Sequence, residues 1–133
     1  MIQFDEAGDN FLKSRTPYTS NQLQPKIQNY FERITLVDKN ETERVTIDMG
    51  LMYRNPETDS IKTVDDLVIV EMKQDGASKS PFRCYLNELR ILPSSMSKYC
   101  LGMVLLYTDL KKNKFNTKIR KINKLTEKKH DTN

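Results

Sequence analysis

A run of four apolar β-formers that leads into Glu71, Met72 and Lys73 predicts a β-strand within residues 66–75. Residues 67–73 read Leu-Val-Ile-Val-Glu-Met-Lys. With the two-residue period of a strand, one face carries only apolar side chains and is predicted to face the core: Val68, Val70 and Met72. The other face combines Ile69 with Glu71 and Lys73. It is either the solvated face of an edge strand or the lining of a polar cavity, where Glu71 faces a cation and Lys73 an anion.

Two earlier segments also predict strands, and together they predict a hairpin. Residues 26–37, which follow Pro25, are rich in Ile, Tyr, Phe and Thr, and residues 42–52 alternate strictly. The residues between them, 38–41, have turn chemistry. Residues 61–64 predict a short additional strand. The pattern therefore predicts a small antiparallel sheet.

The hairpin brings two arginines together. With a two-residue turn, Arg33 lies opposite Thr46. Arg44 then lies opposite Thr35, which makes the two arginines diagonal neighbours about 7 Å apart at the backbone. Two arginines this close repel each other unless an anion or an acid lies between them. The hairpin therefore indicates either an anion site or a solvated pair with a nearby acidic partner, Asp48 or Glu32.

Helical spacing predicts the remaining elements. Residues 6–14 predict a short helix, and Ser80 and Pro81 are typical of an N-cap and first helical position. An amphipathic stripe follows them to about residue 93, and it is predicted to pack in the core: Phe82, Tyr85, Leu86 and Leu89. A buried helix is predicted from the serine-rich segment before Tyr99 to about residue 110. A C-terminal amphipathic helix is predicted from Phe115, Ile119, Ile122 and Leu125.

The predicted buried helix begins with a cation, which the helix dipole disfavours there. Lys98 lies in the first turn, and Ser97 precedes it. A hydroxyl, free backbone N–H groups and an ammonium at one helix N-terminus are typical of an anion site. The alternative is a lysine whose stem covers apolar surface while its ammonium reaches solvent.

Length and composition indicate one rather polar domain. The chain has 133 residues, of which 37% are hydrophobic and 30% charged. It shows neither a signal-peptide pattern nor an apolar run of the roughly 20 residues that a membrane helix needs. Cys84 and Cys100 lack zinc spacing and are expected to be reduced core residues, which favours a cytoplasmic location. The lone histidine, His130, argues against a Ser-His or Cys-His nucleophile.

Four fragments resemble one family, and they occur in the family's order. They are Pro-Lys-Ile-Gln-Asn-Tyr-Phe-Glu-Arg at 25–33, Arg-Val-Thr-Ile-Asp at 44–48, Val-Glu-Met-Lys at 70–73 and Ser-Lys-Tyr-Cys-Leu-Gly at 97–102. The set resembles the VTC domain, the polyphosphate-polymerase branch of the triphosphate tunnel enzymes. The resemblance covers roughly residues 24–125.

The resemblance implies an α+β fold. Its antiparallel β-sheet forms half of a triphosphate-tunnel β-barrel, with helices packed on the outer face. It implies five phosphate-binding residues: Arg33, Arg44, Lys73, Ser97 and Lys98. It also implies that Glu71 holds Mg²⁺ or Mn²⁺, and it assigns no catalytic residue. One carboxylate plus substrate oxygens is a normal Mg²⁺ environment, and phosphoryl transfer depends on positioning and charge neutralisation.

The resemblance also divides the chain and implies partners. Residues 1–24 are an N-terminal segment that is weakly structured or a short helix, 25–125 are the C-terminal half of a tunnel domain, and 126–133 are a frayed basic tail. The N-terminal half of such a domain, with further strands and basic ligands, has no counterpart here. Because about four strands cannot close a tunnel, we expect a separate N-terminal half-domain or a second copy as partner, and triphosphate or polyphosphate as ligand.

Three functions remain open from the sequence. The first is part of an enzyme that makes inorganic polyphosphate from nucleoside triphosphate once the tunnel is complete. The second is a non-catalytic polyanion-binding module with an incomplete tunnel. The third is a nucleic-acid-binding module, since residues 111–133 carry nine basic and two acidic groups, a net charge of +7. This segment has only Phe115 for base stacking, and residues 1–110 have a net charge of −3, which disfavours the third.

Overall fold

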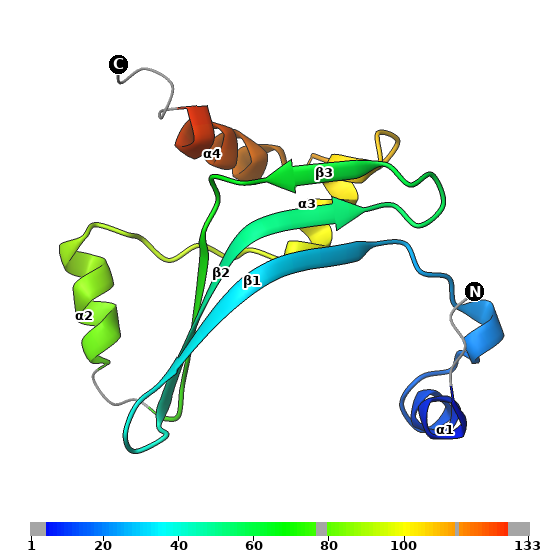
Figure 1. Ribbon diagram of the computed structural model, residues 1–133, viewed down its shortest axis with the longest axis horizontal. Helices are drawn as coiled ribbons and strands as arrows, with labels where there is room; N and C mark the ends of the chain where they lie inside the picture. The colour runs from blue at the N-terminus through cyan, green and yellow to red at the C-terminus, as the bar shows by residue number, and fades with distance from the viewer. Residues whose placement is uncertain (1–4, 77–79, 114, 128–133) are drawn as a thin grey trace.

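The chain folds into an open antiparallel sheet with helices against it (Figure 1). The computed structural model describes residues 5–76, 80–113 and 115–127. Its strands are β1 (Gln28–Val37), β2 (Glu43–Arg54), β3 (Ile61–Val64) and β4 (Ile69–Gln74). Its helices are α1 (Glu6–Arg15), α2 (Pro81–Glu88), α3 (Lys98–Leu106) and α4 (Asn116–Glu127), with a 3-10 turn at Ser20–Gln22. The predicted α+β class is confirmed, and the described sheet is not closed into a barrel.

β2 is the central strand of the sheet. β1 pairs with one side of β2, while β3 and β4 pair with the other side, at residues 51–54 and 43–48 respectively. All three pairings are antiparallel, so β3 and β4 follow each other along the same side of β2. Each part of the described sheet is therefore three strands wide, with β1 on one edge and β3 and β4 on the other.

The turn between β1 and β2 is longer than predicted, which shifts the register by two residues. The backbone N–H of Asp38 donates to the carbonyl of Glu43 at 3.0 Å, so four residues lie between this pair. The Asp38 carboxylate also accepts a hydrogen bond from the backbone N–H of Glu43 at 2.9 Å, which stabilises the longer turn. Arg33 consequently lies opposite Asp48 and not opposite Thr46 as predicted. A shift of two leaves every side chain on its predicted face.

A β-bulge at Gly50 bends the sheet. The register between β1 and β2 shifts at this level, and Gly50 has a φ of 59°, a backbone region that favours glycine. Because one extra residue enters β2, Leu51 and Tyr53 point to the same face as Asp48. The strict alternation predicted through residues 42–52 therefore breaks at Gly50.

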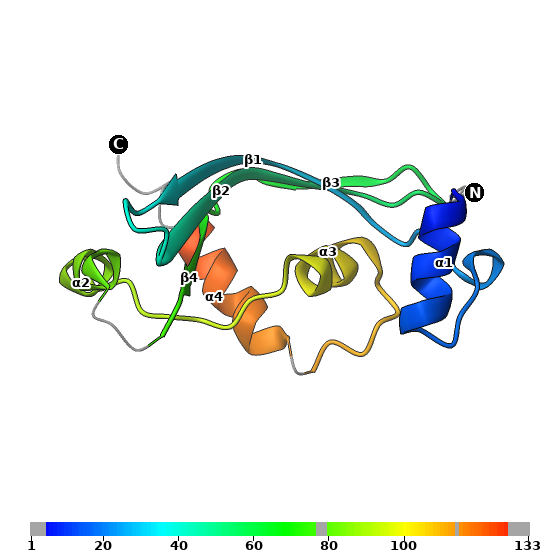
Figure 2. The same ribbon diagram turned by 90° about the horizontal axis from the view of Figure 1, so that it is seen from below.

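Helices α3 and α4 lie on the concave face of the bent sheet (Figure 2). The buried core there joins strand and helix side chains: Leu51, Tyr53, Leu67, Leu101 and Ile122. Lys98 at the start of α3 pairs with Asp48 of β2, so α3 lies on the face that carries the polar side chains of the hairpin. We expected the helices on the opposite, outer face. The placement differs because the bulge turns Leu51 and Tyr53 towards the concave side.

The convex face of the sheet carries exposed apolar side chains. Val68 and Val70, predicted to face the core, are 52% and 36% exposed. Ile34 and Leu36 of β1 are also exposed on this face. The prediction of a core face is therefore wrong for Val68 and Val70, because α3 and α4 cover the other side of the sheet, whereas Met72 is half-buried opposite Val45, which is 3% exposed.

Helix α2 forms where predicted, but its apolar side does not join the core. The Ser80 hydroxyl accepts a hydrogen bond from the backbone N–H of Arg83 at 2.9 Å, which confirms the predicted cap. Tyr85 and Leu89 of the predicted core stripe are exposed. Cys84 is exposed too, contrary to prediction; it and the half-buried Cys100 are free thiols. No helix within residues 5–76, 80–113 and 115–127 is long and apolar enough to cross a membrane.

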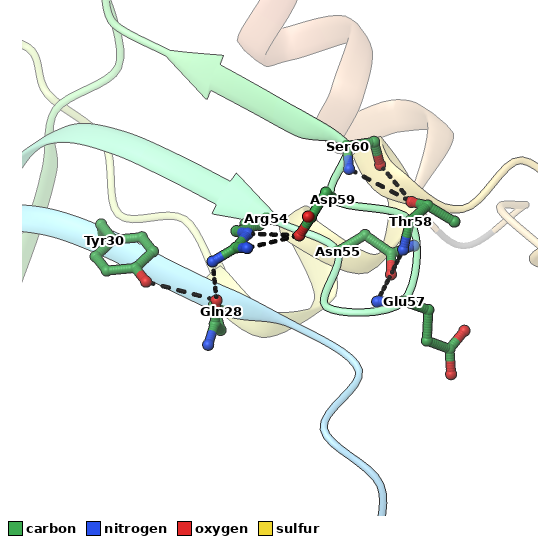
Figure 3. A network of polar contacts seen from close by, with 8 residues as sticks. All are labelled: Gln28, Tyr30, Arg54, Asn55, Glu57, Thr58, Asp59 and Ser60. Carbon is green, nitrogen blue, oxygen red and sulfur yellow. Dashed lines mark hydrogen bonds and ion pairs between the residues drawn. The ribbon is translucent and has the colours of Figure 1, made fainter. Parts of the chain in front are cut away.

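Polar contacts order the connection between β2 and β3 (Figure 3). Asn55 is buried, and its Oδ1 accepts a hydrogen bond from the backbone N–H of Glu57 at 2.8 Å. Arg54 Nη2 donates to Asp59 Oδ1 at 2.6 Å, and Arg54 Nη1 donates to Gln28 of β1 at 3.3 Å. This network joins β1, the end of β2 and the β2–β3 connection, at the end of β2 remote from the β1–β2 turn.

Gly50→Ala is expected to lower the free energy of unfolding by about 1–2 kcal/mol, because a Cβ is unfavourable in the left-handed region. Nothing lies within 4 Å of an added Cβ there, so the cost comes from the backbone and not from a clash. Gly50→Asn should cost less, since asparagine tolerates this region better. Urea denaturation of both variants tests the order, and equal stability of Gly50→Ala and the wild type would contradict it.

Candidate functional site

Six side chains from three strands line a pocket on the concave face. It has a volume of about 180 Å³, and it is lined by Arg33, Thr35, Arg44, Thr46, Glu71 and Lys73. Four of these residues are site residues predicted from the sequence: Arg33, Arg44, Glu71 and Lys73. They converge because each occupies a position on the same face of β1, β2 or β4, in register across the sheet. Glu71 and Lys73 thus line a polar pocket from an edge strand, where their side chains are 47% and 63% exposed.

Arg44 and Lys73 lie directly opposite each other in β2 and β4. Like charges at such positions repel each other unless a counter-charge is present. Glu71 Oε1 lies 3.4 Å from Lys73 Nζ, but both side chains are about half exposed or more, so this pair contributes little to stability. Among the described ion pairs, none involves Arg44. The pocket lining therefore has an excess of positive charge.

The Thr46 hydroxyl is a second feature that points to a ligand. Thr46 is 8% exposed, and its Oγ1 has no hydrogen-bond partner among the described residues. It lies between the Arg44 and Asp48 positions on the pocket side of β2, and Glu71 is its cross-strand neighbour. A buried hydroxyl without a partner is unfavourable, so a polar ligand that reaches this atom would gain a hydrogen bond that the protein alone does not supply.

Asp48 links the pocket to the start of α3. Its carboxylate is fully buried and accepts hydrogen bonds from Arg33, Nε to Oδ1 at 2.6 Å and Nη2 to Oδ2 at 2.9 Å. Lys98 Nζ lies 2.6 Å from Asp48 Oδ2. The hydrogen bonds from Arg33 lower the pKa of Asp48, burial opposes this shift, and Lys98 adds to the lowering. Asp48 therefore stays ionised between two cations.

Ser97 and Lys98 lie at the predicted helix start but do not line the pocket. The Ser97 hydroxyl accepts a hydrogen bond from the backbone N–H of Cys100 at 3.3 Å, so it caps α3. The Lys98 side chain is 19% exposed and pairs with Asp48. The structure thus connects Lys98 with Arg33 through Asp48, while it gives Ser97 a local role at the cap.

Sequence reasoning missed the central position of Asp48 and the involvement of Thr46. Asp48 was considered only as a possible partner of solvated arginines. Both residues follow Arg44 at intervals of two, which is the signal that places them on the face of Arg44 in a strand. Phe31, two residues before Arg33, lies on the same face, and its ring contacts the cationic groups of Arg33 and Lys98 at 5.0 and 5.2 Å.

The donor set of the pocket fits a divalent cation only together with a ligand. Among the described residues, no group of three or more His, Cys, Asp or Glu side chains could hold a metal ion. Glu71 is the one carboxylate of the pocket lining, and the Asp48 carboxylate, outside this lining, already pairs with Arg33 and Lys98. Mg²⁺ commonly binds through one or two carboxylates plus substrate phosphates, so Glu71 fits that arrangement.

Comparison with protein-family models matches residues 8–107 to the VTC domain. Searches of curated proteins and of solved structures give no match. The matched range spans about three quarters of the chain and includes the whole pocket lining as well as Ser97 and Lys98. The chain therefore belongs to the VTC domain family, which is related to the polyphosphate polymerases.

Proposed function

We propose that the concave face binds a triphosphate or inorganic polyphosphate, and that the activity it serves is metal-dependent phosphoryl transfer that makes polyphosphate from nucleoside triphosphate. The observation that carries the proposal is the convergence of Arg33, Arg44 and Lys73 on one pocket, beside the unpartnered hydroxyl of Thr46. Phosphate oxygens match arginine and lysine donors in charge and geometry, and hydrogen bonds between ionised groups are about twice as strong as neutral ones.

Each site residue predicted from the sequence has a proposed role. Arg33, Arg44 and Lys73 donate to phosphate oxygens, and Lys98 would meet the phosphate chain at the start of α3, beside Ser97. Glu71, together with phosphate oxygens, would hold Mg²⁺ or Mn²⁺, which when bound offsets negative charge on the phosphoryl oxygens. Phosphoryl transfer is driven mainly by positioning and electrostatic stabilisation, so the proposal needs no protein nucleophile.

Completion of a tunnel requires a second surface opposite the pocket. The described sheet is open, and β1 has an unpaired edge. Either an N-terminal half-domain or a second copy of this chain would supply that surface. If a second copy supplies it, we expect light scattering at micromolar concentration to show a dimer. If the chain is a monomer, the N-terminal half-domain is the proposed partner.

Tripolyphosphate binding tests the proposal. We expect calorimetry to detect binding, and we expect Arg44→Gln and Lys73→Gln each to weaken it by about tenfold, roughly the loss of 1.4 kcal/mol of binding free energy. Lys13→Gln in α1 is the matched control, because its side chain is exposed and lies outside the pocket. Absence of binding by the wild-type chain, or equal losses in all three variants, would contradict the proposal.

A non-catalytic polyanion-binding module is the second candidate. The openness of the described sheet and the presence of a single carboxylate, Glu71, in the pocket lining favour it. Assays of phosphate release and of chain growth, with nucleoside triphosphate and Mn²⁺, separate the two candidates. Binding of tripolyphosphate without turnover, in the presence of any completing partner, would favour the module.

A further inference from the structure

The Asp48 carboxylate is buried between two cations. Asp48 is 0% exposed. Its two carboxylate oxygens accept hydrogen bonds from Arg33 at 2.6 and 2.9 Å, and Lys98 Nζ lies 2.6 Å from Oδ2. Arg33 uses its Nε and Nη2 towards Asp48, which leaves the other N–H groups of the guanidinium for another acceptor. Lys98 likewise retains donors that Asp48 does not use.

The ring of Phe31 supports the same two cations. The guanidinium carbon of Arg33 lies 5.0 Å from the centre of this ring, and Lys98 Nζ lies 5.2 Å from it. Phe31 itself packs against the buried core beneath α3. Both cations are therefore held from one side by a carboxylate and from another by an aromatic face, which restricts their positions.

We propose that Asp48 is a positioning residue, whose buried carboxylate fixes Arg33 and Lys98 so that their remaining donors present a preformed anion-binding surface. This inference rests on the proposed binding of polyphosphate or triphosphate. Asp48 itself does not contact the anion, because its own charge would repel it. Its contribution is to reduce the conformational entropy that Arg33 and Lys98 would otherwise lose when the ligand binds.

For Asp48→Asn, the positioning role and net charge alone predict opposite changes in the affinity for a polyanion. Asp48→Asn removes a negative charge next to the pocket, and electrostatics alone would therefore tighten the binding of a polyanion. If Asp48 positions the two cations, the same substitution weakens binding despite the added net positive charge. Asparagine keeps a side-chain oxygen that accepts a hydrogen bond, and the side chains of Arg33 and Lys98 are 39% and 19% exposed and so keep contact with solvent, so the variant is expected to fold.

The experiment measures the Kd of tripolyphosphate without metal, by calorimetry, for the full chain. We expect Asp48→Asn to raise the Kd by about tenfold, the lower end of the loss seen when supporting partners of bound ions are removed. Glu32→Gln makes the same change in net charge at an exposed β1 residue on the other face, opposite Met49, and should leave the Kd unchanged or slightly lower. In the wild type, NMR should also show an Arg33 Nε–H signal protected from solvent exchange, and Asp48→Asn should lose this protection.

A second variant covers failure of Asp48→Asn to fold. Phe31→Leu keeps an apolar residue against the core and changes no charge, so it should raise the Kd without altering the net electrostatic attraction. Binding by Asp48→Asn that is as tight as wild type or tighter overturns the positioning role while the proposed function stands. If Asp48→Asn does not fold, an unchanged Kd in Phe31→Leu overturns it. Absence of binding by the wild type overturns the proposed function and this role with it.

Discussion

Arg33→Met is expected to lower the free energy of unfolding at neutral pH by about 3 kcal/mol. The substitution leaves the fully buried carboxylate of Asp48 with Lys98 as its remaining ion-pair partner. Removing one partner of a buried ion pair typically costs about 3–5 kcal/mol, because an uncompensated charge stays in the interior. We expect the lower end of this range, since the Arg33 side chain is itself 39% exposed.

The cost of Arg33→Met should shrink in acid. In the wild type the pKa of Asp48 is lowered, chiefly by the hydrogen bonds from Arg33. A carboxyl whose pKa is lowered by folding stabilises the fold above its unfolded pKa of about 3.9, and that contribution is lost as the pH falls through the folded pKa. In Arg33→Met most of this stabilisation is absent at every pH, because Arg33 is the main cause of the lowered pKa. The difference in unfolding free energy should therefore be largest near pH 7 and should decrease below about pH 4.

Arg54→Met is the matched control for this prediction. Arg54 also pairs with an aspartate, Asp59, at 2.6 Å, but the Asp59 side chain is 72% exposed. Exposed ion pairs contribute about 0–1 kcal/mol, so this variant should lose at most that amount and show little dependence on pH. Urea denaturation of both variants from pH 3 to pH 7 measures the contrast. Equal, pH-independent losses would show that burial of Asp48 does not govern the effect.

The polar face of the hairpin could be predicted from the sequence even though its register could not. The predicted two-residue turn was wrong, but the true register differs by two, which preserves the face of each side chain. Arg33, Arg44, Glu71 and Lys73 were therefore correctly placed on one surface. The alternation of residue types decides the face, whereas the length of the turn depends on local hydrogen bonds of Asp38 that composition does not reveal.

The position of the core could not be predicted from alternation alone. Gly50 was the available signal, because glycine inside a strand often marks a bulge. Because of the bulge, Leu51 and Tyr53 lie on the concave face. Helix α3 therefore packs on the concave face, and the opposite face, with Val68 and Val70, stays exposed. The helices thus share a face with the proposed site, and their packing fixes the position of Lys98 relative to Asp48.

Gly102→Ala is expected to be strongly destabilising, by about 3 kcal/mol, although alanine favours a helix interior over glycine by about 1 kcal/mol. Gly102 is buried in α3, and a Cβ there would lie 2.4 and 2.7 Å from two ring carbons of Tyr53. It would also lie 3.1 Å from Cδ1 of Ile27. Because Tyr53 is 1% exposed, its ring has no free space into which to move. Thermal and urea denaturation should show the loss, and a gain in stability would show that α3 can shift away from β2.

Two substitutions of Tyr53 separate the clash from other causes. The Tyr53 hydroxyl is buried without a partner among the described residues, and burial raises its pKa to about 12. Tyr53→Phe removes this unsatisfied group but keeps the ring, so it should be neutral or stabilising and should not rescue Gly102→Ala. Tyr53→Leu removes the ring and should make Gly102→Ala much less costly in the double variant, a non-additivity expected of residues in direct contact. Additive losses would show that the clash with Tyr53 is not the cause of the cost of Gly102→Ala. They would then also contradict the view that the close approach of α3 to β2 at Gly102 fixes the position of Lys98 next to Asp48.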